Sequence, residues 1–204
     1  MKTKSENSWV HNLPWAYSMG CHGGFSLDEA TRRSWYSPEA VLSDLKAGMT
    51  FVDVGCGDGF FSLLAAKKVG LEGRVFAVDV DGSRVGLLWD KAAAAGLTNI
   101  VAVIARAEDT VFCEGCADMV LYSMDLHDFD NPPRVLENAR LMLKPTGRLV
   151  DLDWKKTLMQ IGPPVHIRFS EDKVAEMLKK AKFKVESVKE AGPYHYLITA
   201  VPAP

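Results

Sequence analysis

The sequence predicts a doubly wound α/β fold, in which a mostly parallel sheet of seven strands ends in an antiparallel hairpin. Short apolar segments alternate with helical segments from residue 49 onward, which is the pattern of consecutive βαβ units. The segments FVDV, VFAV and MVLY are almost unbroken apolar runs, as expected for strands covered on both faces. Ligands of such sheets bind beyond the carboxyl ends of the strands, so we expect functional residues there.

Turn and capping residues set the boundaries of the elements. A helix is expected where Pro or an N-cap residue opens an apolar stripe that Gly or Pro ends, and Ala-Gly-Pro separates the last two strands. The predicted strands are 50–54, 74–79, 99–105, 119–123, 148–152, 184–190 and 194–201. The predicted helices are 38–48, 60–69, 83–95, 133–143 and 170–181.

The composition argues against several classes of protein. The 204 residues carry 24 Lys and Arg against 26 Asp and Glu, a net charge of −2, so there is no basic surplus for nucleic acid. No apolar run reaches the ~18 residues of a membrane span, and the N-terminus lacks the apolar stretch of a secretory signal. The four cysteines form no dense disulfide framework, so we expect a cytoplasmic protein.

Residues 1–36 differ in composition from the rest of the chain. They hold three of the five tryptophans, Trp9, Trp15 and Trp35, with glycines between them and little periodicity. We therefore predict an aromatic-rich arm or lid at 1–36 and a single α/β domain at 37–204. The arm could cover a bound ligand, or its tryptophans could only patch an exposed face of the sheet.

A glycine-rich loop follows the first strand, in the sequence D-V-G-C-G-D-G-F of residues 53–60. A dinucleotide fingerprint would read G-x-G-x-x-G, whereas Phe60 stands directly after the third glycine here. Asp53 and Asp58 flank the loop and would repel a pyrophosphate but attract a cation. Asp79, at the end of the second strand, can accept hydrogen bonds from both hydroxyls of a ribose. The loop thus predicts a positively charged, adenosine-like ligand without a pyrophosphate.

This loop resembles motif I of the class I S-adenosylmethionine-dependent methyltransferases. The resemblance continues through V-F-A-V-D-V-D, A-D-M-V-L-Y-S and R-L-M-L-K-P-T-G-R-L-V, and it covers residues 38–200. It implies a Rossmann-like fold and S-adenosylmethionine as cofactor. Within the family, the chain looks most similar to the small-molecule branch that includes quinone-biosynthesis and arsenite methyltransferases.

The resemblance also implies which residues hold the cofactor. The glycine loop would lie against the methionine moiety, with Cys56 as a small filler rather than a nucleophile. Asp53 would reach the ammonium group, Asp79 the ribose and Val80 the adenine. The implied cofactor-binding residues are Asp53, Gly55, Cys56, Gly57, Asp79, Val80, Ala107, Glu108 and Ser123.

One position departs from the family pattern. After the third strand the family commonly carries an acid that binds the adenine amine, but Arg106 stands at that position. Either the backbone at Ala107 contacts the adenine edge, or Glu108 or Asp109 takes the place of the missing acid.

The segment S-M-D-L-H-D after the fourth strand is the predicted acceptor side of the site. His127 titrates near neutral pH and could act as a general base, with Asp125 or Asp128 orienting it. Alternatively, His127 only supports the loop. Asp151 and Asp153, at the end of the fifth strand, are comparable candidates. A base is needed only where the acceptor must lose a proton.

Two further segments carry weaker signals. His166 and Arg168 follow the stiff turn Gly-Pro-Pro and could hold an anionic substrate, or they could belong to a loop that only caps the domain. Residues 113–116 have C-x-x-C spacing, and Cys21 with His22 could complete a zinc site. One such pair in a loop is a weak signal, so no metal is predicted.

The sequence therefore predicts an S-adenosylmethionine-dependent methyltransferase that acts on a small or planar acceptor. Methylation of protein or RNA is an alternative, weakened because no N-P-P-[YF] motif follows the fourth strand. A non-catalytic protein that binds S-adenosylmethionine is another. Phe60 disfavours a nicotinamide dehydrogenase. The expected partner is a small molecule; neither membrane nor nucleic acid is expected, and a homodimer is left open.

Overall fold

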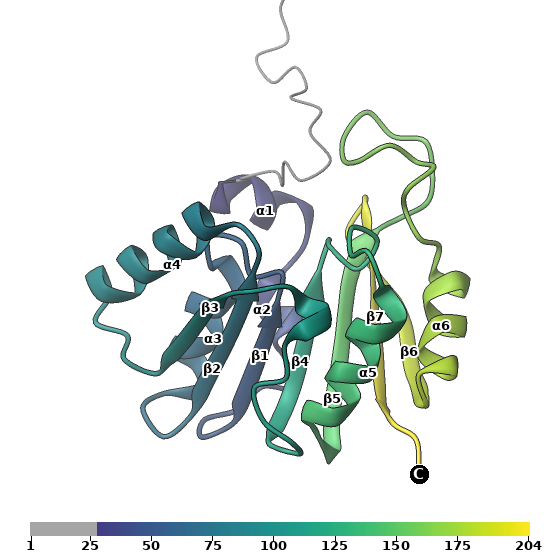
Figure 1. Cartoon of the computed structure of the whole chain (residues 1–204). Helices are drawn as coiled ribbons and strands as arrows, with labels where there is room; N and C mark the ends of the chain where they lie inside the picture. Colours follow the sequence, from purple (N-terminus) through teal and green to yellow (C-terminus); the bar gives the residue numbers. More distant parts are fainter. Residues whose placement is uncertain (1–27) are drawn as a thin grey trace, which may run out of the picture.

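The computed structural model describes residues 28–204, whose seven strands form one sheet in the order β3-β2-β1-β4-β5-β7-β6 (Figure 1). Strands β1 to β5 pair in parallel, and β7 lies antiparallel between β5 and β6. The predicted fold class is therefore confirmed. The strands are β1 (Thr50–Val54), β2 (Arg74–Asp79), β3 (Ile100–Ile104), β4 (Ala117–Ser123), β5 (Leu143–Trp154), β6 (Phe183–Ala191) and β7 (His195–Pro202).

Helices cover both faces of the sheet. Helices α5 and α6 pack on one face, whereas α2, α3 and α4 lie on the other (Figure 1). The helices are α1 (Glu29–Trp35), α2 (Pro38–Val41), α3 (Phe60–Val69), α4 (Gly82–Ala94), α5 (Pro132–Met142) and α6 (Glu171–Lys180), with a single 3₁₀ turn, η1 (Ala107–Asp109). Predicted capping residues serve as such: the Ser170 side chain accepts the N–H of Lys173 at the start of α6.

Alternation along β1 explains how one strand contributes to two cores. Phe51 packs with Phe61 of α3, whereas Val52 packs with the cluster that holds Leu136 of α5. All four side chains are buried, and burial of each large apolar group contributes about 2 kcal/mol to stability. The sheet is thus fixed on both faces.

The strand order reverses between β1 and β4, which is where ligands bind in doubly wound sheets. Val54 of β1 is in register with Val78 of β2 and with Tyr122 of β4. The loops that follow these three strands therefore begin at one level of the sheet, and they carry the predicted site residues.

Two predicted elements need correction. The helix predicted at 38–48 ends at Val41, and turns follow, in which Asp44 pairs with Arg148 of β5. Strand β5 begins at Leu143, before the predicted start at 148, because pairing with β4 starts ahead of a bulge. Part of the predicted arm is the helix α1, whereas Trp9 and Trp15 lie outside the described residues.

The C-x-x-C segment contains a disulfide between Cys113 and Cys116, a pairing that the sequence analysis does not predict. It precedes β4 and therefore lies at the opposite end of the sheet from the glycine loop, so these sulfurs do not face the predicted site. Cys21 and His22, the other proposed metal ligands, are outside the described residues.

Two searches of the described residues complete the picture of the fold. Between residues 28 and 204, no group of three or more His, Cys, Asp or Glu side chains is arranged to hold a metal ion. Over the same range, no helix combines the length and apolar character needed to cross a membrane.

Candidate active site

The glycine loop and the loop after β4 meet at Gly55. Gly55 and Gly57 have φ angles of 72° and 53°, in the left-handed region that residues with side chains rarely adopt. A Cβ atom at Gly55 would collide with the carboxyl group of Asp125. Glycine is therefore required here both by the backbone conformation and by the close approach of the β4 loop.

Asp79 is fixed at the rim of the glycine loop by two backbone donors. The Gly57 N–H donates to its Oδ2 at 2.8 Å, and the Asp81 N–H donates to its Oδ1 at 2.9 Å. The N–H groups of Gly55 and Cys56 both donate to the Val78 carbonyl, which ties β1 to β2. Each carboxylate oxygen keeps a lone pair for a further donor, so Asp79 can still accept hydroxyl groups.

Asp53 is buried beneath the loop, and its Oδ2 accepts the Ser62 hydroxyl at 2.5 Å. Burial raises the pKa of Asp53 to about 6, although the Ser62 hydrogen bond and the charge of Arg32 oppose the shift. Burial also raises the pKa of the Cys56 thiol, so this thiol stays neutral. A buried neutral thiol behaves as a small apolar filler, as the sequence analysis expects.

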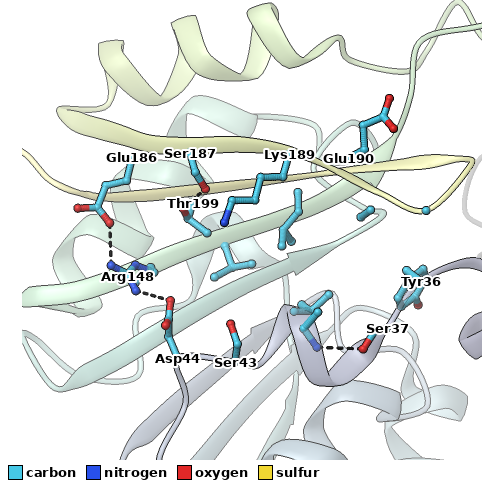
Figure 2. A pocket seen from close by; sticks show the side chains of 16 residues that line it. Tyr36, Ser37, Ser43, Asp44, Arg148, Glu186, Ser187, Lys189, Glu190 and Thr199 are labelled. Atoms are coloured by element: carbon cyan, nitrogen blue, oxygen red, sulfur yellow. Dashed lines mark hydrogen bonds and ion pairs between the residues drawn. The ribbon is translucent and has the colours of Figure 1, made fainter.

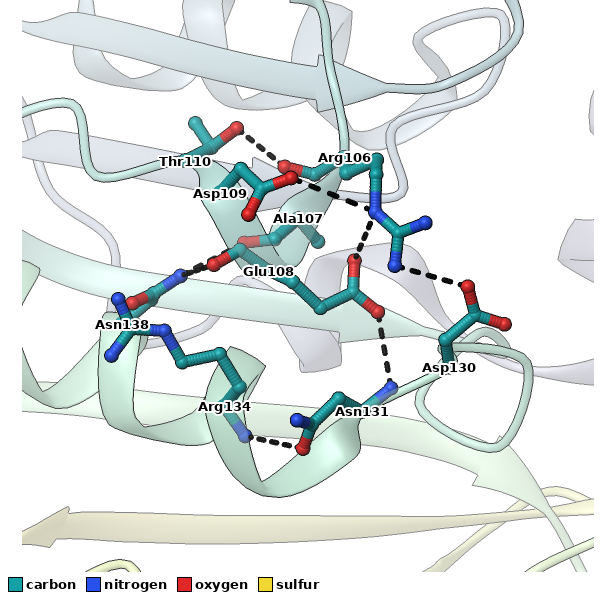
Figure 3. Close-up of polar contacts among 9 residues, drawn as sticks. All are labelled: Arg106, Ala107, Glu108, Asp109, Thr110, Asp130, Asn131, Arg134 and Asn138. Atoms are coloured by element: carbon teal, nitrogen blue, oxygen red, sulfur yellow. Dashed lines mark hydrogen bonds and ion pairs between the residues drawn. The ribbon is translucent and has the colours of Figure 1, made fainter.

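The predicted adenine end combines an exposed apolar side chain with a rigid backbone. Val80 is 60% exposed beside the loop after β2. Across from it, the Asn138 side-chain amide donates to the carbonyls of Ala107 and Glu108, at 3.0 and 2.8 Å (Figure 3). Glu108 Oε1 accepts the N–H of Asn131 at 3.1 Å. The η1 turn is therefore anchored to α5.

Arg106, which replaces the acid typical of the family, is surrounded by carboxylates (Figure 3). Its guanidinium lies 3.0 Å from Asp130, 3.6 Å from Asp109 and 3.7 Å from Glu108. Both oxygens of Glu108 are thus engaged, one by the Asn131 N–H and one by Arg106.

The loop after β4 turns sharply at Met124, whose φ of 64° is left-handed. That conformation costs roughly 1–2 kcal/mol for a residue with a side chain and persists only where its surroundings impose it. The turn lays Asp125 over Gly55, and neither carboxyl oxygen of Asp125 has a hydrogen-bond partner within residues 28–204. Burial, followed by the charge of Asp153, raises the pKa of Asp125 well above its usual range.

His127 and Asp153 form a buried pair, with His127 Nδ1 2.9 Å from Asp153 Oδ2. Burial lowers the pKa of His127, but the hydrogen bond and charge of Asp153 outweigh it, and the net shift is upward. Asp128 lies farther away, with Oδ1 3.5 Å from Nε2. The hydrogen-bond partner of His127 in the structure is therefore Asp153, rather than Asp125 or Asp128. The sequence does not reveal that the end of β5 packs against this loop.

Asp151 and Ser123 lie on β5 and β4, next to the region beyond the carboxyl ends of β1, β2, β4 and β5, which we call the crevice. Asp151 is fully buried on β5, in register with Tyr122 of β4, and neither carboxyl oxygen has a partner in the described part of the chain. Burial and the charge of Asp153 raise its pKa well above the usual range. The Ser123 hydroxyl is also buried at the end of β4.

An aromatic cluster, which the sequence analysis misses as a unit, joins α1 to the ends of β5 and β7. His195 lies 4.3 Å from Trp154 and 5.2 Å from Tyr36, and Trp35 lies 5.5 Å from Trp154, all measured between ring centroids. Burial, followed by the charge of Arg32, lowers the pKa of His195 to about 3. The only sequence signal is the aromatic content of the arm.

The two predicted substrate ligands separate in the structure. The buried Arg168 guanidinium donates to the carbonyls of Pro163 at 2.7 Å and Ile161 at 2.9 Å, and also to those of Lys155 and Thr157. It therefore holds the 155–168 loop together, the alternative set beside substrate binding, and we do not retain it as a substrate ligand. His166 is exposed on the same loop.

A groove of about 600 Å³ lies between α2 and the β6–β7 hairpin, apart from the crevice (Figure 2). Arg148 crosses it and pairs with Asp44 and Glu186, while Lys189 and Tyr36 line its sides. The groove is lined by residues other than the predicted cofactor and acceptor residues, so we do not assign the active site to it.

The sheet order and the position of the glycine loop are those of the class I methyltransferase fold. The crevice suits S-adenosylmethionine as cofactor, because buried carboxyl groups fit a cationic nucleoside that carries no phosphate. The chain belongs to the methyltransferase domain family: the family model described as "Methyltransferase domain" matches residues 45–192.

Individual relatives agree with this assignment. The chain is 30% identical over 125 residues to the ubiquinone/menaquinone biosynthesis C-methyltransferase UbiE of Hydrogenovibrio crunogenus, covering 61% of this chain and 49% of that protein. It is 32% identical over 125 residues to the nocamycin O-methyltransferase of Saccharothrix syringae, covering 59% and 45%. The chain thus spans about half the length of the curated relatives it matches.

A solved structure matches over more of its length. The crystal structure of an S-adenosylmethionine-dependent methyltransferase from Aquifex aeolicus superimposes with a TM-score of 0.80 and 32% sequence identity. The match covers 85% of this chain and 93% of that one.

Proposed function

We propose that this protein transfers a methyl group from S-adenosylmethionine to a small acceptor molecule. The observation that carries the proposal is that Asp125 approaches the predicted cofactor loop at Gly55 and also feels the charge of Asp153, the buried partner of His127. When bound, the cofactor supplies the transferable methyl group. The protein supplies orientation and charge, and orientation alone is worth about 7–11 kcal/mol in such reactions.

In this proposal the cofactor side of the crevice binds through groups that already hold their positions. Asp79 accepts the ribose hydroxyls, since two backbone N–H groups fix its carboxylate. Asp53 and Ser123 bind the amino-acid part beneath the glycine loop. Val80 and the backbone of Ala107 contact the adenine, and the shape of η1 is maintained from α5.

His127 is the proposed general base. Asp153 accepts a hydrogen bond from Nδ1, which leaves Nε2 as the nitrogen that can take a proton. The upward pKa shift of His127 strengthens it as a base near neutral pH. A base is needed only if the acceptor atom loses a proton, so the pair points to an oxygen or acidic carbon nucleophile rather than to a tertiary amine or a thioether.

The proposed acceptor is a small, partly planar molecule. Trp154, which directly follows Asp153, packs against Trp35, and we place the acceptor beside these rings because flat aromatic side chains favour flat ligands. Two relatives are named as a C-methyltransferase of quinone biosynthesis and as an O-methyltransferase of a small molecule. Both names agree with the nucleophiles that a His127 base would serve.

Thermal unfolding against a ligand panel tests the cofactor part of this proposal. We expect S-adenosylhomocysteine at ~100-fold its dissociation constant to stabilise the protein by about 2.7 kcal/mol, and NAD to leave it unchanged. Transfer of a labelled methyl group to a panel of phenols, hydroquinones and β-diketones tests the acceptor part. Stabilisation by NAD alone, or methyl transfer only to protein or RNA, would contradict the proposal.

A further inference from the structure

Methyl transfer as proposed leaves Asp125 without a role. Its carboxyl group lies over Gly55, in the contact between the glycine loop and the β4 loop. Neither oxygen has a hydrogen-bond partner among residues 28–204, and both are buried. Buried polar groups in proteins almost always have a hydrogen-bond partner, so such a group calls for an explanation.

The backbone actively places Asp125 there. Met124 adopts the left-handed conformation immediately before it, and the Met124 N–H is held by the Leu152 carbonyl at 2.7 Å. The Asp125 carbonyl in turn accepts the Asp128 N–H at 2.9 Å. Two hydrogen bonds and a strained residue therefore aim one carboxyl group at the glycine loop.

The surroundings of this carboxyl group are acidic. Four other carboxyl groups act on it from the ends of β1, β2 and β5, and the Tyr122 hydroxyl and the Cys56 thiol also feel its charge. A positive ligand would reduce the repulsion among these groups, whereas a neutral ligand would not. The four carboxyl groups are those of Asp53, Asp79, Asp151 and Asp153.

The proposed reaction changes the charge of the ligand in this crevice. The bond from sulfur to the methyl carbon breaks, the sulfur keeps the electron pair, and the methyl group forms a bond to the acceptor. The donor sulfur is positive before the step and neutral after it. A carboxyl group aimed at the glycine loop can therefore respond to the progress of the reaction.

The geometry points to Asp125 as the residue by which the crevice prefers the positively charged methyl donor over its neutral product. The inference rests on the proposed function, since it needs both ligands to occupy the crevice. It assigns Asp125 a specificity role rather than proton transfer, and it gives the crevice a physical means of releasing product after the positive charge is lost.

Binding of the charged donor should also change the protonation of Asp125. Burial and neighbouring acids raise the pKa of Asp125, which favours the protonated carboxyl group before the cation binds. A cation lowers that pKa, so binding of the charged donor releases a proton, and its affinity rises with pH. The neutral product has no such effect. The α-amino group is common to both ligands and cancels in the comparison.

Titration calorimetry on the full chain tests the inference, with S-adenosylmethionine and S-adenosylhomocysteine as ligands. We expect the wild-type protein to prefer the methionine form, and Asp125→Asn to reduce that preference about tenfold. Asp58→Asn is the matched control, because Asp58 belongs to the same loop but pairs with Lys91 at 2.7 Å. The control should keep the wild-type preference.

The outcomes separate the two proposals. If neither ligand binds the wild-type protein, the proposed function fails. If both bind and Asp125→Asn keeps the wild-type preference, the role of Asp125 is overturned while the proposed function stands. If Asp125→Asn does not fold, proton release by the wild-type protein decides: calorimetry in two buffers of different ionisation enthalpy should show greater release with the charged donor, and equal release overturns the inference.

Discussion

The two halves of the crevice are built in different ways. On the nucleotide side, at the ends of β1 and β2, the carboxylate of Asp79 accepts two backbone N–H groups and Asp53 accepts the Ser62 hydroxyl. On the acceptor side, at the ends of β4 and β5, Asp125 and Asp151 have buried oxygens without a partner in the described residues. The first half is satisfied before any ligand binds, whereas the second is not.

This difference indicates that the two halves of the crevice have different roles in binding and in catalysis. A half whose donors and acceptors are already fixed binds the common part of a ligand without rearranging. A half that keeps unpaired buried acids and a His–Asp pair is sensitive to charge and protons. We therefore expect substitutions on the nucleotide side to change the affinity for both forms of the cofactor, and substitutions of the His127–Asp153 pair to change rate.

The largest expected effect tests the acceptor side. We expect His127→Ala to lower kcat about 10²–10⁴-fold, because a general base contributes that much, and to leave the Kd of S-adenosylhomocysteine nearly unchanged. Asp153→Asn should lower kcat less and move the ascending limb of the pH–rate profile to lower pH, because the carboxylate that raises the pKa of His127 is gone. An unchanged kcat in His127→Ala would leave the histidine with a structural role only.

The next largest effect tests the nucleotide side. We expect Asp79→Ala to weaken S-adenosylhomocysteine binding roughly 100-fold, because it removes two charge-assisted hydrogen bonds to the ribose. Asp81→Ala is the control: Asp81 caps α4 through Ser83 and Arg84, so its loss should cost about 1 kcal/mol of stability without changing affinity. Calorimetry measures both. Equal affinities in the two variants would mean that the ribose is held elsewhere.

The smallest effect concerns the aromatic cluster beside the acceptor half. The pKa of His195 is about 3 in the fold and near 6.5 when unfolded, so unfolding favours its charged form in acid. Its contribution is fully present above about pH 6.5 and is lost as the pH falls towards 3. We expect His195→Phe to reduce the slope of the free energy of unfolding against pH in this acid range by roughly 1 kcal/mol per pH unit.

Urea unfolding at several pH values checks this prediction. Asp53 acts in the opposite direction, since its pKa is raised to about 6 in the fold and the folded state gains as the pH falls through that value. The comparison of His195→Phe with wild type cancels the Asp53 contribution, because Asp53 is present in both. Parallel stability curves for the two proteins would show that His195 is charged in the fold.

The geometry of the glycine loop follows from the sequence more directly than that of the loop after β4, for a physical reason. The glycine loop and Asp79 are consecutive parts of one βαβ unit, so spacing along the chain defines their geometry. The His127–Asp153 pair joins segments 26 residues apart, and the choice among Asp125, Asp128 and Asp153 depends on the turn at Met124. The positive φ of a non-glycine residue has no sequence signature.

The misplaced element boundaries have a similar origin. The helix predicted at 38–48 begins at Pro38, as expected. Leu42 and Leu45 are buried with residues of α3, but they lie in turns rather than in a continuous helix. Arg168 illustrates the same limit: a cation after a Gly-Pro-Pro turn fits a substrate ligand and a loop clasp equally well in sequence, and only its four carbonyl partners decide.

The hydrogen bonds from Arg168 to the carbonyls of the 155–168 loop have a consequence for how such a protein can change its substrate. The guanidinium of Arg168 fixes the path of the 155–168 loop from inside. The shape of this loop therefore does not depend on the side chains that point outward. Residues on the outer side of this loop, His166 among them, can therefore be exchanged without unfolding it. One anchoring cation thus leaves the rest of the segment open to new chemistry.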